Sequence, residues 1–378
     1  MELSFWEKES YFAPVDVAII GSGIVGLNAA WHLKRTNSNL KVTVLERGLL
    51  PTGASSRNAG FACFGSPSEL LSDLQHHTEG QVFGLVERRW KGLEKLRKNL
   101  GDSVIDYHRW GGYELFFPED ELYRQCADKL PYLNKMLASV IGEKEVFKQA
   151  DTKISHFGFG KISHLIESTC EGQIDTGKMI TALTREVQSA GVQVLCGLEV
   201  KALYDIGEFQ ELVLAQGPTI KARQVIVCTN GFARQLLPDL NVVPARAQVL
   251  ITAPIPDLKI KGVFHFDEGY YYFRNIGNRV LFGGARNLDF AGEETFHFGT
   301  TPHIQNKLEQ MLQEVILPTT EHKIEHRWSG IMGMGQQKGP IIKAVNDKVV
   351  CAVRLGGMGV AIGSLVGEEA AEMVLQTL

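Results

Sequence analysis

A glycine-rich turn that directly follows an apolar strand is the feature that most constrains the fold of this chain. The run 15–20 (VDVAII) has the length of a strand, and residues 21–26 (GSGIVG) follow it without a break. Residues 27–34 carry apolar side chains at helical spacing, and 41–46 (KVTVLE) has the pattern of a second strand. A strand, a helix and a second strand of this length form a βαβ unit. The segment therefore predicts a Rossmann-like α/β domain with a buried parallel sheet.

Three glycines and one acidic residue of this unit predict a dinucleotide site. Gly21 allows a tight turn, Gly23 lets the backbone approach a pyrophosphate, and Gly26 lets the helix pack closely on the strand. The helix N-terminus offers free N–H groups to the same anion. Glu46 ends the second strand, where its carboxylate can accept hydrogen bonds from ribose hydroxyls, and it argues against the 2′-phosphate of NADP. The predicted contacts are Gly21, Ser22, Gly23, Ile24, Val25, Gly26, Leu45, Glu46 and Arg47.

The segment 53–61 (GASSRNAGF) is small and polar, so it can run along an extended cofactor. With this segment the sequence resembles the FAD-dependent oxidoreductases of the D-amino-acid oxidase type, whose members carry a GAS-x-RN-x-G motif against the FAD phosphates and flavin. The resemblance implies FAD, bound without a covalent bond, in place of NAD. The contacts that it implies are Gly53, Ala54, Ser55, Ser56, Arg57, Asn58, Ala59, Gly60 and Phe61.

Further segments carry the same resemblance in the same order along the chain. They are 173–178 (QIDTGK), 225–231 (VIVCTNG), 243–249 (VPARAQV), and 271–274 (YYFR) with 279–284 (RVLFGG). Ala247 replaces the glycine that is usual in the third of them. The resemblance places Glu199 and Val200 at the adenine end of the cofactor, and Thr229, Asn230 and Gly231 at the end of a buried strand beside it.

A glycine-rich turn near the C-terminus, 355–359 (LGGMG), precedes an apolar helical pattern over 360–375. The positive end of such a helix favours negative charge, and in the resembled family that charge develops on the flavin during reduction. A buried C-terminal helix with a glycine-rich entry is the simpler alternative. The expected contacts are Arg354, Leu355, Gly356, Gly357, Met358, Gly359 and Val360.

Both ends of the chain also resemble one group of amine oxidoreductases, the gamma-glutamylputrescine oxidases, and glycine oxidases are similar too. The approach segment 4–6 (SFW) matches that group. Leu355 and Met358 stand where the group has Tyr and His, which leaves the particular substrate open.

The resemblance implies two interwoven domains, and the apolar patterns place their expected boundaries. Residues 13–100, 151–236 and 327–378 are expected to form the FAD-binding domain, with 1–12 as an approach segment. Residues 101–150 and 237–326 are expected to form a substrate domain with a mainly antiparallel sheet.

Four side chains are candidates for contact with the substrate. Strand alternation puts Tyr272 and Arg274 on one face of a hairpin whose counterpart faces the flavin in the resembled family, although packing alone also explains the aromatic residue. Arg354 could bind a substrate carboxylate, contact the flavin or lie at the surface. Cys63 lies close to the 53–61 segment, and a core thiol is the simpler interpretation.

Composition excludes several other classes of protein. The formal net charge is −4 and no long run of one sign occurs, so nucleic acid is not expected as a partner. No apolar run approaches the roughly 20 residues of a membrane span, and the N-terminus lacks the pattern of a secretory signal. The six cysteines show no CxxC spacing, and no histidine pair has metal-ligand spacing. We therefore expect a cytoplasmic protein with reduced thiols and no metal.

The resemblance implies an FAD-dependent oxidoreductase that oxidises an amine or amino acid to an imine, which water then hydrolyses. The electron acceptor would be oxygen or a quinone. An FAD-dependent 2-hydroxyacid dehydrogenase is an alternative, although no histidine near the predicted site is apparent as its base. A redox sensor or assembly subunit that binds FAD without turnover is the alternative from another class.

Overall fold

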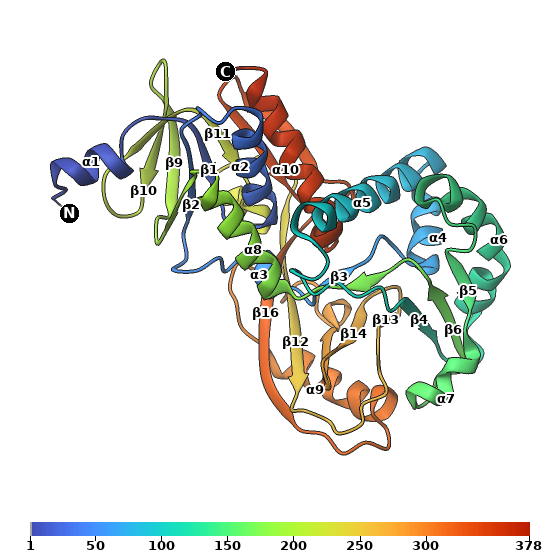
Figure 1. Cartoon of the computed structure of the whole chain (residues 1–378). Helices are drawn as coiled ribbons and strands as arrows, with labels where there is room; N and C mark the ends of the chain where they lie inside the picture. The colour runs from blue at the N-terminus through green and yellow to red at the C-terminus, as the bar shows by residue number, and fades with distance from the viewer. Residues whose placement is uncertain (1) are drawn as a thin grey trace.

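The computed structural model describes residues 2–378, and two large sheets dominate it (Figure 1). The first sheet contains β1 (Val15–Ile20), β2 (Val42–Glu46), β8 (Gln193–Cys196), β9 (Val200–Asp205), β10 (Gln210–Leu214), β11 (Ile220–Val227), β17 (Ile341–Asn346) and β18 (Val349–Val353). The second contains β4 (Gly112–Phe116), β5 (Phe147–Gln149), β6 (His164–Ser168), β12 (Val243–Thr252), β13 (Val263–Phe266), β14 (Tyr271–Ile276), β15 (Arg279–Gly284) and β16 (Ile324–Met334). The short strands β3 (Phe61–Ala62) and β7 (Gly172–Gln173) pair between them.

Ten α-helices occur in the described residues. They are α1 (Phe5–Tyr11), α2 (Ile24–Thr36), α3 (Ala54–Arg57), α4 (Pro67–His76), α5 (Glu79–Leu100), α6 (Glu121–Ile141), α7 (Ile154–Phe157), α8 (Thr176–Ser189), α9 (Pro302–Met311) and α10 (Gly359–Leu375). Short 3₁₀ turns cover Asp151–Lys153, Asn230–Gln235 and Arg286–Leu288, and a π-helical turn covers Leu312–Ile316. None of the helices in residues 2–378 combines the length and apolar character needed to cross a membrane.

The first sheet confirms the predicted parallel α/β core. Its central strands run in the order β18-β11-β1-β2-β8, all parallel, with β17 antiparallel at one edge and the β9–β10 hairpin attached to β11. Alternate residues of β1 enter two different cores: Val17 and Ile19 pack under α2, α8 and α10, while Ala18 and Ile20 pack toward β9 and β10. Burial on both faces explains why this strand is apolar almost throughout.

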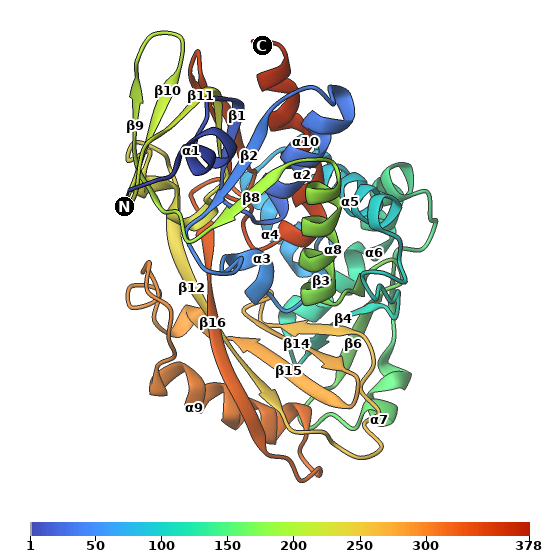
Figure 2. The same cartoon turned by 60° about the vertical axis from the view of Figure 1, so that its left-hand side comes forward.

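Helix α10 lies directly against α2, as Figure 2 shows, and this contact joins the two ends of the chain. A β-carbon at Gly367 would come within 2.5 Å of the carbonyl oxygen of Val25, so only glycine allows the helices to approach this closely. Both helices therefore present their N-termini to the same region of the molecule.

The second sheet is mainly antiparallel, as predicted, with one parallel pair between β13 and β4. Apolar side chains of one face pack against α9 and the segment 154–162. The β4, β6 and β5 end is covered by α4, α5 and α6. The fold class is therefore mixed α/β, in agreement with the expectation from the sequence.

Two of the expected domain limits differ from the arrangement of strands. β6 lies in the 151–236 segment that was expected in the FAD-binding domain, yet it pairs with β4 and β5 of the second sheet. β16 overlaps the 327–378 segment and pairs with β12 of the second sheet. The residue pattern of a strand does not indicate which strand it will pair with. The sheet to which β6 and β16 belong is therefore decided only by the tertiary structure.

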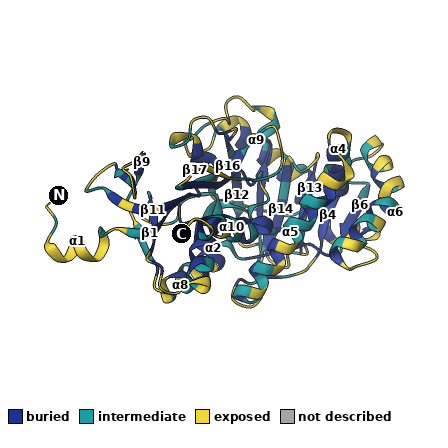
Figure 3. Cartoon of the chain, turned by 90° about the horizontal axis from the view of Figure 1, so that it is seen from above, coloured by how far each residue is buried: buried dark blue, intermediate teal, exposed yellow. Residues whose placement is uncertain are grey.

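The N-terminal segment forms a short helix that stands out from the molecule (Figure 3). Ser4 caps α1, and Glu7 completes a capping box by bonding back to the backbone N–H of Ser4. None of the seven residues of α1 is buried.

Candidate functional site

One elongated cavity of about 750 Å³ is lined by residues of both sheets and by the N-termini of α2 and α10. Its volume lies in the usual range for small-molecule and cofactor sites, roughly 300–1,000 Å³. Most of the residues expected at the cofactor line it: Gly21, Gly23, Ile24, Val25, Leu45, Glu46, Arg47, Gly53, Ala54, Ser55, Arg57, Asn58, Ala59, Phe61, Glu199, Val200, Thr229, Asn230, Arg354, Leu355, Gly356, Gly357, Met358, Gly359 and Val360. Ser22, Gly26, Ser56, Gly60 and Gly231 lie behind this wall and do not line the cavity.

The first glycine-rich turn has backbone geometry that excludes side chains. Gly21 has φ +107°, which L-residues rarely adopt, and a β-carbon there would come 2.9 Å from the carbonyl oxygen of Cys228. A β-carbon at Gly26 would collide with the carbonyl oxygen of Gly21. At Gly23 it would meet the Ser55 hydroxyl at 2.9 Å, and this hydroxyl accepts the N–H of Ile24 in the first turn of α2. Each of the three glycine positions of this turn therefore leaves little room for a side chain.

Glu46 lies buried at the end of β2, with both carboxylate oxygens held. Oε2 accepts hydrogen bonds from the Ser22 backbone N–H (3.2 Å) and hydroxyl (2.7 Å), and Oε1 accepts the N–H of Gly48 (2.9 Å). These bonds fix the carboxylate where it lines the cavity. Beyond it, the Arg47 guanidinium lies 3.6 Å from the centre of the Phe232 ring.

The residues at this end fit FAD. Two helix N-termini face the cavity, as an anionic pyrophosphate and a reduced flavin require. The Thr229 hydroxyl is buried, lines the cavity and has no hydrogen-bond partner among the described residues. Because buried polar groups are nearly always satisfied, this hydroxyl is suited to a polar atom of a bound cofactor.

The other end of the cavity is lined by polar side chains that the sequence analysis did not single out. They are Ser66, Glu69, Asp73, Arg89, Glu171, His265, Glu268, Arg286 and Lys338. The sequence carries a signal for two of them: Glu69 and Asp73 are four residues apart and so share one face of helix α4. The others come from separate elements, and only the fold brings them together.

Glu171 is the most deeply buried carboxylate of this end, at 2% exposure. Its Oε1 accepts the backbone N–H groups of Phe64 (2.9 Å) and Gly65 (3.2 Å). Burial raises the pKa of Glu171 to about 7, against the effect of those two N–H groups and with a smaller contribution from the charge of Glu69. This carboxyl group can therefore gain or lose a proton near neutral pH.

His265 and Glu114 form a buried pair at the wall of the same end. The His265 Nδ1 lies 4.0 Å from Glu114 Oε1 and has no hydrogen-bond partner, while the residue lines the cavity. Burial lowers the pKa of His265 and raises the pKa of Glu114 to about 8. Both groups are thus uncharged at neutral pH, and their contact is not an ion pair.

Cys63 and Tyr272 line the cavity as expected. Burial, followed by the charge of Glu171, raises the pKa of the Cys63 thiol well above its usual range, so the thiol stays protonated. The Tyr272 ring packs edge-on against Phe61 at 5.7 Å, and burial raises the pKa of its hydroxyl to about 12. Neither group is ionised at neutral pH.

The two arginines proposed from the sequence occupy structural positions. Arg274 is buried and does not line the cavity; a β-carbon on Gly60 would come 2.8 Å from its Nη2. Arg354, with φ +64°, lines the cavity, but its guanidinium donates hydrogen bonds to the carbonyl oxygens of Gly339 (3.0 Å) and Asn241 (3.1 Å). These bonds favour support of the β16–β17 loop over recognition of a substrate carboxylate.

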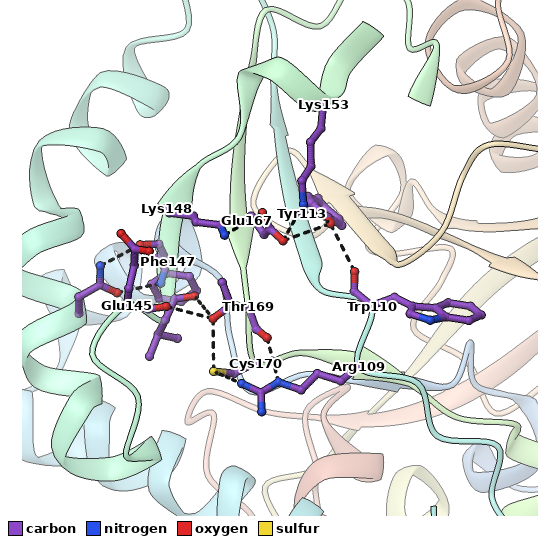
Figure 4. A network of polar contacts seen from close by, with 12 residues as sticks. Arg109, Trp110, Tyr113, Glu145, Phe147, Lys148, Lys153, Glu167, Thr169 and Cys170 are labelled. Atoms are coloured by element: carbon purple, nitrogen blue, oxygen red, sulfur yellow. Dashed lines mark hydrogen bonds and ion pairs between the residues drawn. The ribbon is translucent and has the colours of Figure 1, made fainter. Parts of the chain in front are cut away.

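A separate polar network on β4 and β6 lies outside the cavity lining (Figure 4). Lys153 Nζ donates to Glu167 Oε1 (2.8 Å) and to the Tyr113 hydroxyl (3.0 Å). Arg109 donates to the carbonyl oxygen of Thr169 (2.9 Å) and contacts the Cys170 sulfur (3.1 Å). The network holds the segment that leads from β6 into Glu171. Within residues 2–378, no group of three His, Cys, Asp or Glu side chains is arranged to hold a metal ion.

Comparison with known proteins agrees with this geometry. The family described as DAO, FAD dependent oxidoreductase, matches residues 16–373. A probable oxidoreductase OrdL from Rhizobium meliloti is 24% identical over an alignment of 381 positions, which covers 95% of this chain and 83% of that protein.

Solved structures share the fold at low identity. Glycine oxidase from Geobacillus kaustophilus superposes with a TM-score of 0.76 at 21% identity, covering 96% of this chain and 95% of that one. L-proline dehydrogenase from P. horikoshii gives the same TM-score at 17% identity, covering 96% and 94%. The resemblance inferred from the 53–61 segment is confirmed, and with it FAD as the cofactor. Because the family match spans nearly its whole length, the chain belongs to the DAO family of FAD-dependent oxidoreductases.

Proposed function

We propose that this enzyme oxidises the C–N bond of an amine or amino acid, with release of an imine that water hydrolyses. The bound flavin would supply the hydride acceptor, its N5 atom. The observation that carries the proposal is the polar end of the cavity, where the carboxylates of Glu69, Asp73 and Glu171 can attract a substrate ammonium group. Glycine oxidase and L-proline dehydrogenase, which share the fold, are named for C–N substrates.

The protein contributes position and exclusion of water. Phe61 and Tyr272 form an apolar contact at the wall of the cavity, next to the segment expected along the flavin. Lys338 Nζ forms an ion pair with Asp73 Oδ1 at 2.5 Å, and this pair connects the β16–β17 loop to α4 across the cavity. Holding the reacting carbon in one place lowers the entropic part of the barrier.

His265 supports oxidation of a 2-hydroxyacid as a second candidate function. Removal of a hydride from a C–OH group needs a base for the hydroxyl proton, and His265 is uncharged at neutral pH and lines the cavity. The sequence alone did not place any histidine there.

One anaerobic experiment separates the candidates. The FAD-loaded protein is mixed with glycine, sarcosine, L-proline, putrescine or lactate, and the absorbance of oxidised flavin is followed. We expect bleaching by at least one of the four nitrogen compounds. Bleaching by lactate alone would establish the hydroxyacid reaction instead. If none of the five compounds reduces the flavin, oxidation of these simple amines is contradicted and the sensor alternative gains support.

A further inference from the structure

One carboxylate oxygen of Glu171 receives no N–H or O–H donor. Oε1 accepts the N–H groups of Phe64 and Gly65. Oε2 accepts no N–H or O–H group of residues 2–378, and the Glu171 side chain lines the cavity. A buried carboxylate that lines a ligand cavity and has one oxygen free of N–H and O–H donors is a candidate proton acceptor.

The backbone around Glu171 holds this oxygen in place. The Glu171 carbonyl oxygen accepts the N–H of Gly111 at 3.2 Å. A β-carbon at Gly112 would collide with the Glu171 carboxylate, so the side chain packs directly on the backbone of β4. Arg109 fixes Thr169 and Cys170, the residues immediately before it (Figure 4). The position of the carboxylate is therefore determined before any ligand arrives.

The charged groups near Glu171 come from two helices and from the β16–β17 loop. Glu69 and Asp73 lie on α4, and Asp73 is paired with Lys338. Arg89 on α5 donates a hydrogen bond to the carbonyl oxygen of Phe64. Its guanidinium is also attracted by the carboxylates of Glu69, Asp73 and Glu171. The protonated Cys63 thiol lies within hydrogen-bonding reach of Glu171. Uncharged His265 completes the wall on β13. At this end of the cavity the carboxylates of four residues outnumber the cations of three, which favours a cationic ligand; they are Glu69, Asp73, Glu171 and Glu268 against Arg89, Arg286 and Lys338.

We propose that Glu171 Oε2 accepts the proton of the substrate ammonium group, an inference that rests on the proposed C–N oxidation. An ammonium nitrogen has no lone pair, so it must lose a proton before a C=N bond can form. The N–H bond breaks, its electron pair stays on nitrogen, and the proton bonds to Oε2. The C–H bond then breaks with its electron pair, and carbon is oxidised by two electrons as the hydride reaches the flavin. The nitrogen lone pair forms the C=N bond, and Glu171 later returns its proton to water.

Two matched variants test the role. Glu171→Gln keeps an acceptor for Phe64 and Gly65 but loses the base. Glu69→Gln removes a neighbouring cavity carboxylate and keeps an acceptor for the Ser66 N–H, which Glu69 holds at 3.0 Å. Both variants are compared with wild type in anaerobic rapid mixing over pH 6–10, using whichever of glycine, sarcosine, L-proline or putrescine reduces the flavin.

The pH profile of the second-order rate constant of flavin reduction gives the result. In wild type we expect an acid limb near pH 7, where Glu171 becomes protonated. Glu171→Gln should lose this limb and react at least ~100-fold more slowly at pH 7, the usual contribution of a general base. The deficit should shrink toward pH 10, where the amine loses its own proton to solvent. Glu69→Gln should keep the limb and move it to lower pH, because the Glu69 charge raises the pKa of Glu171.

A binding measurement without turnover gives an independent readout. tert-Butylamine has no hydrogen on the carbon next to nitrogen and cannot be oxidised. Calorimetry of its binding to the holoenzyme at pH 7, in buffers of different ionisation heat, should show release of about half a proton per site, because Glu171 is about half protonated before binding. Glu171→Gln should release none.

The outcomes separate the two proposals. If no amine reduces the wild-type flavin, the C–N oxidation is overturned. If an amine reduces wild type and Glu171→Gln at the same rate with the same pH profile, the function stands and the role of Glu171 is overturned. Equal proton release in wild type and Glu171→Gln would likewise contradict contact between Glu171 and the amine.

Discussion

At the scale of the single residue, Glu46 has a structural role in the glycine-rich turn and an expected role in cofactor binding. A substitution of Glu46 tests both roles. Its carboxylate closes the turn through Ser22 and Gly48, and it lines the cavity where a ribose is expected. Hydrogen bonds to a charged group contribute roughly 1.5–3 kcal/mol each. Glu46→Ala should therefore weaken FAD binding by well over tenfold in a fluorescence titration of the apoprotein. Glu199→Gln, a change of a partly exposed cavity carboxylate paired with Lys201, should have a much smaller effect. Equal affinities of wild type and Glu46→Ala would contradict the ribose contact.

The glycines at the cofactor are not equivalent, and two of them make a matched pair. A β-carbon at Gly23 would meet Ser55 at 2.9 Å, whereas a β-carbon at Gly53 has no neighbour within 4 Å. Both residues have extended backbone at a helix N-cap, with φ −77°. Gly23→Val should yield colourless protein, and Gly53→Ala should retain FAD after gel filtration. Retention of FAD by Gly23→Val would refute the close approach of backbone and pyrophosphate.

At the scale of elements, the β16–β17 loop is held over the cavity by two cationic side chains of unequal importance. Arg354 is 5% exposed and bonds to the carbonyl oxygens of Gly339 and Asn241. The Lys338 side chain is about half exposed, and such ion pairs contribute little, about 0–1 kcal/mol. Arg354→Met should lower the melting temperature by several degrees and reduce FAD content, while Lys338→Met should leave the melting temperature nearly unchanged. The reverse order would show that Arg354 is free to bind substrate.

Elements formed by local sequence were predictable, and their tertiary partners were not. β1, α2 and β2 follow from local apolar periodicity and glycine placement. The residue patterns of β6 and β16 predict strands but do not predict the strands with which they pair. The same limit applies to the site: Gly21 and Glu46 belong to a local motif, whereas Glu171, His265 and Arg89 meet only because three distant segments pack together.

At the scale of the whole molecule, the cavity joins the two sheets, so its occupant should stabilise both together. The lining includes β1 and β2 of the first sheet and β12, β14 and β16 of the second. A ligand that binds only the folded state adds about 2.7 kcal/mol at a concentration 100 times its dissociation constant. FAD added to the apoprotein should therefore raise the melting temperature by at least ~3 °C. NAD at the same concentration should not, because the 53–61 segment and the α10 N-terminus would lack the flavin that they are placed to contact. An equal shift with NAD would mean that the cavity recognises only the adenosine and pyrophosphate that both cofactors share.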